Sequence, residues 1–139
     1  ITPASGFVGP GGALLIGITA GAVCFFATQF IKRTLQIDDS LDVMPTHGVG
    51  GILGTLMAGI FASTGLGVFS GYGFAEGIET MSGQVSVQLI GIAATFIYTA
   101  VATWIILKVV GAMVGLRVSE EIEVQGLDTA EHEEAGYNI

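Results

Sequence analysis

One histidine in this chain stands inside an apolar stretch that has the length of a membrane-spanning helix. His47 is the single ionisable residue between Val43 and Thr64. A polar group at membrane depth must find a partner, and intramembrane ionisable residues are usually functional. Imidazole also changes charge near neutral pH, so it can relay protons. We therefore interpret His47 as a pore or relay histidine. The alternative is a structural histidine bonded to a carbonyl of a neighbouring helix.

The spacing around His47 predicts that small side chains share its face. On an α-helix, with about 100° per residue, one group of residues lies within about 60° of the histidine. This group consists of Val43, Gly50, Gly51, Gly54, Ala58 and Phe61. Bulky aliphatic residues fall on the opposite half. We expect Gly50, Gly51 and Gly54 to serve helix packing, and His47 to face neighbouring helices or a cavity.

Further glycine pairs have the same spacing. Gly17 and Gly21, and Gly111 and Gly115, form G-x-x-x-G pairs in the other two apolar stretches. Such pairs let helix backbones approach closely in a membrane. Three pairs in three stretches favour tightly packed helices over lone anchors.

Carboxylates stand directly before the stretch that holds His47. One interpretation is helix capping, in which Asp42 or Ser40 accepts from free backbone N–H groups. Pro45 agrees with it, because proline in a first helical turn removes no needed donor. The other is an inner vestibule that stabilises cations, to which Asp38, Asp39 and Asp42 would all contribute. The sequence leaves both open.

The composition of the chain defines the elements that must position these residues. Of 139 residues, 51% are hydrophobic and 12% are charged, and the mean hydropathy is +0.75. This hydropathy excludes a disordered chain, and 4 basic against 12 acidic residues exclude a nucleic-acid binder. One cysteine excludes a disulfide framework. Soluble domains carry about 25% charged residues, so we predict an all-α integral membrane protein.

Three stretches are long enough to cross a hydrocarbon layer of about 30 Å. We predict a membrane region over residues 1–116 and an acidic tail over 117–139. The region divides into spans at about 11–31, 43–64 and 85–116, with an outer loop at 65–84.

Basic residues indicate the orientation. They stand at the C-terminal ends of the first and third spans and are Lys32, Arg33, Lys108 and Arg117. By the positive-inside rule these ends are cytoplasmic. We expect a multi-pass protein of the cell (inner) membrane, with the N-terminus outside and the tail inside. Trp104 and Lys108 are expected at one interface, where the ammonium group can reach water.

Two further expectations concern completeness and chemistry. The chain has no initiator Met and no signal-peptide pattern, so we expect a fragment or one chain of a larger assembly. We find no nucleophile with a matched base and orienting group, which disfavours an enzyme. No cofactor or metal is expected.

The ordered motifs resemble the Amt/Mep/Rh ammonium transporters along the whole chain, and the bacterial Amt branch fits best. The run from Asp38 to Val43, followed by His47 to Ile52, resembles the signature of the tenth helix. Other segments look like the link between helices eight and nine, the following outer loop and the cytoplasmic tail. They are Ile1–Gly6, Gly71–Gly77, Val114–Val118 and Gly126–Asp128, with His132 and Tyr137.

The resemblance implies a fold of eleven helices, of which this chain would hold helices nine to eleven and the tail. It implies a homotrimer in which each protomer has its own apolar pore with two adjacent histidines at mid-depth. His47 matches the second histidine, and Val43 matches a pore-lining valine. Asp39 and Asp42 match carboxylates with structural roles near the inner mouth.

The resemblance also implies a regulatory tail that responds to PII-type proteins, for which the candidate residues are Arg117, Glu120, Glu121 and Asp128. The chain departs from the family in two respects. It has Met44-Pro45-Thr46 in place of the commoner Phe-Gly/Pro-Val. It also lacks the first eight helices, with the partner histidine and the outer ammonium site.

Our hypothesis is ammonium or ammonia transport by this chain as the C-terminal part of an Amt-type transporter. The expected partners are the substrate, the missing helices and the lipid bilayer. One alternative is a membrane-anchored interaction module that acts through its acidic tail, where Glu120, Glu121, Glu123 and Asp128 would face a basic protein. Another is a truncated product that does not transport.

Overall fold

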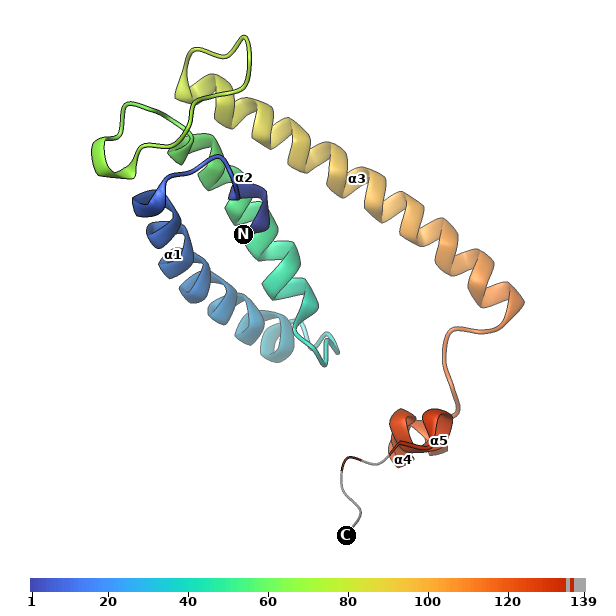
Figure 1. The fold of residues 1–139 in the computed structure, drawn as a ribbon. Coiled ribbons are helices and arrows are strands. Elements are labelled where there is room, and N and C mark those ends of the chain that lie inside the picture. Colours follow the sequence, from blue (N-terminus) through green and yellow to red (C-terminus); the bar gives the residue numbers. More distant parts are fainter. Residues whose placement is uncertain (135, 137–139) are drawn as a thin grey trace. The chain divides into compact units, whose positions relative to one another are not determined.

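All regular structure in the described part of the chain is helical. The structure is a computed structural model that describes residues 1–134 and 136, and it contains no strand within them (Figure 1). This agrees with the predicted all-α class. The chain divides into two compact units, Ile1–Thr95 and Phe96–Ile139, and one long helix, α3, contributes to both. Tyr137, which the resemblance assigns to the tail, lies outside the described residues.

The first long helix, α1, spans Pro10–Gln29 and continues as a π-helical turn over Phe30–Thr34. Pro10 stands at the first helical position, where its missing N–H group is not needed. Lys32 and Arg33 lie in the last turn, where positive charge complements the helix dipole. Together the two segments run for 25 residues, which matches the first predicted span.

The second helical element begins with a π-helical segment, Met44–Val49, and continues as α2, Gly50–Phe61. The two add up to 6 + 12 = 18 residues. At about 1.5 Å per residue this length is slightly below a hydrocarbon layer of about 30 Å. The element is shorter than the predicted 43–64. Its first turn also contains the polar residues Thr46 and His47, which lower the hydropathy of the element.

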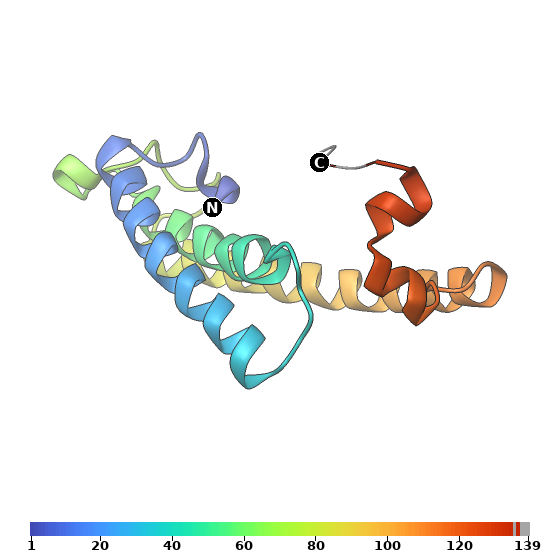
Figure 2. The ribbon, with the colours of Figure 1, turned by 90° about the horizontal axis from the view of Figure 1, so that it is seen from below.

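The helices α1 and α2 pack against each other in the first unit, and a short 3-10 turn, Thr2–Ala4, packs on α2 (Figure 1). Their core consists of Ala4, Ile16 and Ala58. Figure 2 shows the connection from α1 back to the start of the second element, at the end of the pair opposite the loop that follows α2.

Hydrogen bonds hold the loop that follows α2 at the end of the pair where α1 begins. The backbone N–H of Tyr72 donates to the carbonyl of Phe7 at 3.1 Å. Gly71 and Gly73 donate to Ser63 and Ala62, each at 2.8 Å. Gly71 is required here, since a Cβ atom at this position would overlap the carbonyl oxygens of Phe61 and Phe7. The N-terminal segment and this loop therefore lie at one end of the first unit.

The third long helix, α3, spans Met81–Met113, 33 residues. None of its most apolar stretch is buried within the chain. The Lys108 ammonium lies 5.9 Å from the centre of the Trp104 ring, which agrees with their expected neighbourhood. The helix ends three residues before the predicted Leu116. Gly115 follows it with φ 83°, a left-handed conformation that favours glycine.

Two short helices follow α3 in the second unit, α4 (Glu120–Gln125) and α5 (Leu127–His132). Two helical segments, Pro10–Thr34 and Met81–Met113, are long and apolar enough to cross a membrane, and they overlap the stretches predicted at 11–31 and 85–116. The span predicted at 43–64 is helical over Met44–Phe61, and its crossing of a membrane stays a prediction.

Candidate functional site

His47 lies in the π-helical segment Met44–Val49, and its side chain is exposed on the surface of this chain. A π-helix has i→i+5 hydrogen bonds, and short π-helical turns are rare and frequently occur at functional sites. The apolar spacing predicted an α-helix here. The π-helix is therefore a feature that sequence pattern missed. The available signal was Pro45 in the first turn, but proline there is equally typical of an α-helix.

The π-helix changes which residues share a face with His47. Each of its residues turns the chain by less than the ~100° of an α-helix. Gly50 and Gly54 are buried, whereas His47 is exposed and Val43 is 50% exposed. The α-helical expectation placed all four on one side. In this chain the glycines pack inward, and His47 and Val43 lie on open surface.

Two apolar residues that precede His47 are exposed together with it. Val43 and Met44 are each about half exposed and precede the histidine by one turn or less. An imidazole among aliphatic and thioether groups can accept or donate one hydrogen bond, but it offers no fixed charge to an ion.

The residue that caps the His47 segment is Asp39. Its carboxylate accepts from the backbone N–H of Val43 at 2.9 Å and from that of Met44 at 2.7 Å. These two bonds, first that of Met44, hold the pKa of Asp39 below its usual 3.8. Capping was predicted for Asp42 or Ser40, so that assignment is wrong. Local spacing cannot distinguish neighbouring acceptors when the chain between them bends.

Asp42 instead forms an ion pair with the end of α1. Its Oδ1 atom lies 2.7 Å from the Lys32 ammonium. The backbone at Asp42 is left-handed, with φ 55°. The hydroxyl of Ser40 donates to Asp38 at 3.3 Å, so these side chains interact within the connection. The structure brings Asp39, Asp42 and Lys32 together before the segment that carries His47.

The glycine pairs differ in what they contact. A Cβ atom at Gly54 would lie 2.7 Å from Cα of Ile1, and one at Gly50 would lie 3.2 Å from Sγ of Cys24. A Cβ atom at Gly51 would meet nothing within 4 Å.

A Cβ atom added at Gly17 or at Gly21 would likewise meet none of the described residues within 4 Å. The prediction that Gly111 and Gly115 form a pair inside one helix is wrong, because α3 ends at Met113.

The predicted tail residues lie on α4 and α5. Glu120 and Glu121 are exposed in the first turn of α4, where carboxylates complement the helix dipole. Asp128 stands in the first turn of α5. Arg117 binds Glu123 through two hydrogen bonds, of 2.5 and 2.8 Å, which lower the pKa of Glu123 from its usual 4.5.

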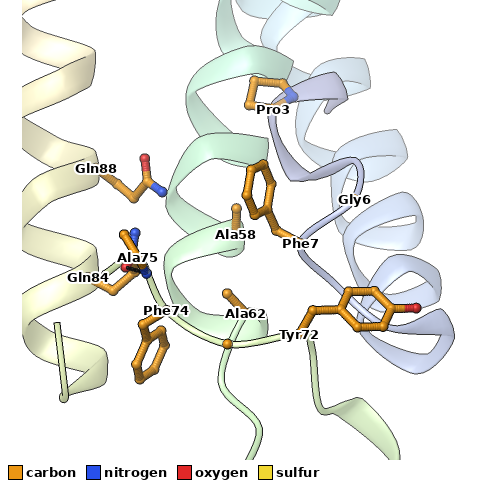
Figure 3. Close-up of a pocket in the computed structure, with 11 residues that line it drawn as sticks. Pro3, Gly6, Phe7, Ala58, Ala62, Tyr72, Phe74, Ala75, Gln84 and Gln88 are labelled. Atoms are coloured by element: carbon orange, nitrogen blue, oxygen red, sulfur yellow. Dashed lines mark hydrogen bonds between the residues drawn. The ribbon is translucent and has the colours of Figure 1, made fainter. Parts of the chain in front are cut away.

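A cavity of about 580 Å³, which no sequence motif indicated, lies in the first unit, where the N-terminal segment, α2, the loop that follows α2 and the start of α3 meet (Figure 3). Gln84 is 6% exposed, and its Oε1 atom accepts from the N–H of Ala75 at 2.9 Å. Gln88, Phe7 and Phe74 also line the space (Figure 3). Among the described residues, no group of three or more His, Cys, Asp or Glu side chains could hold a metal ion.

Comparison with known proteins identifies what the chain is similar to. The family model "Ammonium Transporter Family" matches residues 1–137. The chain is 44% identical over 138 residues to "Ammonium transporter Amt1" of Archaeoglobus fulgidus, covering 99% of this chain and 34% of that protein.

Two further relatives give the same result. The chain is 42% identical to an "Ammonium transporter" of Aquifex aeolicus, covering all of this chain and 31% of that protein. It is 38% identical to one of Bacillus subtilis, covering 99% of this chain and 33% of that protein. The chain thus spans about a third of the length of these curated relatives.

Proposed function

Because the chain belongs to the Ammonium Transporter Family, we propose that it forms part of a longer protein that moves ammonium or ammonia across a membrane. Its two long apolar helical segments and its family support a membrane location. Within this proposal, the chain is the C-terminal third of the transporter. His47 and Val43 lie along the path of the substrate.

The observation that carries the proposal is the exposed imidazole of His47, which follows the half-exposed side chains of Val43 and Met44. An ammonium ion in an apolar passage would lose its hydration and face the large penalty of a buried charge, whereas neutral ammonia would not. A neutral imidazole can accept a hydrogen bond from ammonia through one nitrogen and donate through the other. The substrate therefore crosses as ammonia past His47, and the proton is conveyed separately.

The first experiment replaces His47 in the complete protein that contains this chain. We expect His47→Ala to change the rate of ammonium transport, or the discrimination of ammonium from potassium, while the protein still assembles. The matched control is His132→Ala, because His132 is the second of the two histidines and lies on α5 of the tail. Uptake or current in proteoliposomes is the measurement. Unchanged rate and selectivity in His47→Ala would reject the assignment.

The same proposal covers assembly and orientation. None of the most apolar stretch of α3 is buried among the described residues, and a Cβ atom at Gly17 or Gly21 would meet none of them within 4 Å. We propose that the preceding helices of the same protein, and the other protomers of a homotrimer, cover this stretch and both glycines. Lys32 and Arg33 end the first apolar segment, which supports an N-terminus outside and a cytoplasmic tail.

A second candidate function concerns the tail; separately, we propose that Asp39 and Asp42 lie at the inner vestibule of the transporter. The tail carries exposed carboxylates, and Arg117 and Glu123 hold its start together. We propose that Arg117, Glu120, Glu121 and Asp128 take part in docking a regulator of the PII type. Truncation after Leu116 tests this: lost binding of the regulator with intact transport supports a docking role, and unaffected binding contradicts it.

A further inference from the structure

The turn at Asp42 holds a residue in an unfavourable backbone conformation immediately before the His47 segment. Asp42 has φ 55°, in the left-handed region that residues other than glycine rarely adopt. Such conformations persist only where the surrounding contacts impose them, and they are frequent at functional sites. Asp42 stands two residues before the π-helical segment Met44–Val49, which contains His47.

Three groups impose this conformation from different directions. The side chain of Asp42 is held by the Lys32 ammonium at 2.7 Å. Its Oδ1 atom is buried and has no hydrogen-bond partner among the described residues, although the side chain as a whole is 36% exposed, so the Lys32 ammonium acts on it through the charge of the ion pair. The carbonyl of Asp42 accepts from the hydroxyl of Thr46 at 2.5 Å and from the N–H of Thr46 at 3.1 Å.

The far end of the π-helical segment is also fixed. It leads into α2, where Gly50 and Gly54 approach Cys24 and Ile1 so closely that added Cβ atoms would lie 3.2 and 2.7 Å away. His47 thus lies between a turn that is held by the ion pair with Lys32 and a helix that is held by close packing at Gly50 and Gly54. If the turn relaxes, the intervening residues can return to α-helical geometry, which turns each residue further about the axis. The direction of the imidazole then changes while α2 stays in place.

We infer that Lys32, Asp42 and Thr46 are positioning residues that set the direction of the His47 imidazole. The inference rests on the proposed function only for its effect on transport. Thr46 carries particular weight, because its hydroxyl makes a bond that an aliphatic side chain at this position cannot make. In the proposed function, a change in the direction of the His47 imidazole alters its hydrogen bonds to each substrate molecule that passes.

The main experiment compares two substitutions of Asp42 in the complete protein. Glycine adopts positive φ readily, whereas alanine does not, so Asp42→Gly keeps the turn and Asp42→Ala releases it. We expect Asp42→Ala to lower the maximal transport rate about tenfold, with little change in the apparent affinity, and Asp42→Gly to lower it far less. The second readout is the rate at which diethyl pyrocarbonate modifies His47, followed by mass spectrometry. Both substitutions remove the ion pair with Lys32, so that rate should change in both, and it should change more in Asp42→Ala, which also loses the left-handed turn.

The chain offers a matched control in the same connection. Gln36 is exposed and also has a left-handed backbone, with φ 53°, but it lies on the other side of the Asp39 cap. Gln36→Ala introduces the same kind of strain, and we expect it to leave the modification rate of His47 unchanged. A change as large as that in Asp42→Ala contradicts a specific positioning role.

Two conservative pairs test the groups that hold Asp42, even if Asp42→Ala fails to fold. Thr46→Val removes the hydroxyl and keeps the branched shape, while Thr46→Ser keeps the hydroxyl. Lys32→Met removes the charge, while Lys32→Arg keeps it. We expect Thr46→Val and Lys32→Met to alter the modification rate of His47. In Thr46→Ser and Lys32→Arg the rate should stay close to that of the wild type. Equal behaviour within both pairs overturns the inference.

The outcomes also separate this inference from the proposed function. A modification rate that follows the expected order, together with normal transport in His47→Ala, supports positioning and contradicts the role of His47 in transport. Altered transport in His47→Ala, with a modification rate that ignores Asp42, Thr46 and Lys32, contradicts positioning alone.

Discussion

At the scale of single residues, the carboxylate of Asp39 shows how one acceptor starts the segment that carries His47. It takes two backbone N–H groups, those of Met44 and Val43, which the first turn of a helix otherwise leaves without partners. Both bonds favour the ionised form and lower its pKa below 3.8. Ionisation of Asp39 and the order of the first turn are therefore coupled.

This coupling predicts a pH dependence with a definite sign. A group whose pKa is lower in the folded state stabilises that state above its unfolded pKa, and the contribution is lost as pH falls through the folded pKa. For Asp39 the contribution is constant from pH 8 to about pH 5 and declines progressively in stronger acid. We expect Asp39→Asn to lower the unfolding temperature of the solubilised complete protein at pH 7. The difference from wild type should shrink below pH 3.8. A difference that instead changes between pH 5 and pH 8 contradicts the assignment.

At the scale of elements, α2 is defined by the side that it presents to α1 and to the N-terminal segment. Gly50, Gly54 and Ala58 follow one another every four residues and are all buried. Gly51 stands next to Gly50 in sequence, yet a Cβ atom there meets nothing within 4 Å. Adjacent glycines therefore have different structural roles.

The contrast predicts different results for two alanine substitutions. In Gly54→Ala the added methyl group meets the backbone of Ile1, and overpacking of this kind costs about 1–3 kcal/mol. In Gly51→Ala the same methyl group meets open space within this chain, and alanine favours the helix by up to about 1 kcal/mol. Thermal unfolding of the two variants of the complete protein, side by side, measures the difference. Equal destabilisation by Gly51→Ala would show that another part of the protein packs against that side.

At the scale of the whole molecule, the chain exposes more apolar surface than a self-contained protein would. None of the most apolar stretch of α3 is buried among the described residues. Large side chains such as Phe96, Ile97 and Trp104 are exposed by more than half. The curated relatives are about three times as long as this chain. Lipid and the remaining helices are the surroundings that such surface requires.

This surface predicts that residues 1–139 alone do not transport. In the proposed function, His47 lines one side of a passage that further helices close, so ammonium uptake should require the longer protein. Proteoliposomes containing residues 1–139 alone should show the uptake of empty vesicles, and those containing the complete protein should show more. Uptake by residues 1–139 at the rate of the complete protein would contradict the requirement for additional helices.

Much of this protein follows from local sequence pattern. Runs of apolar residues determined the helical class and the first and third spans, because helix length and hydropathy are properties of consecutive residues. The ordered motifs around His47 determined the family. The ends of the elements were less accurate: α3 stops before Gly115, whose left-handed backbone ends the helix.

Only the tertiary structure decided how the segment that carries His47 is held. The π-helix, the cap by Asp39 in place of Asp42 or Ser40, and the pairing of Lys32 with Asp42 all depend on the end of α1 meeting the start of the next element. Likewise, a contact with Ile1 distinguishes Gly54 from Gly51. These contacts join residues that are distant in the chain or separated by a bend, and periodicity along one helix carries no information about them.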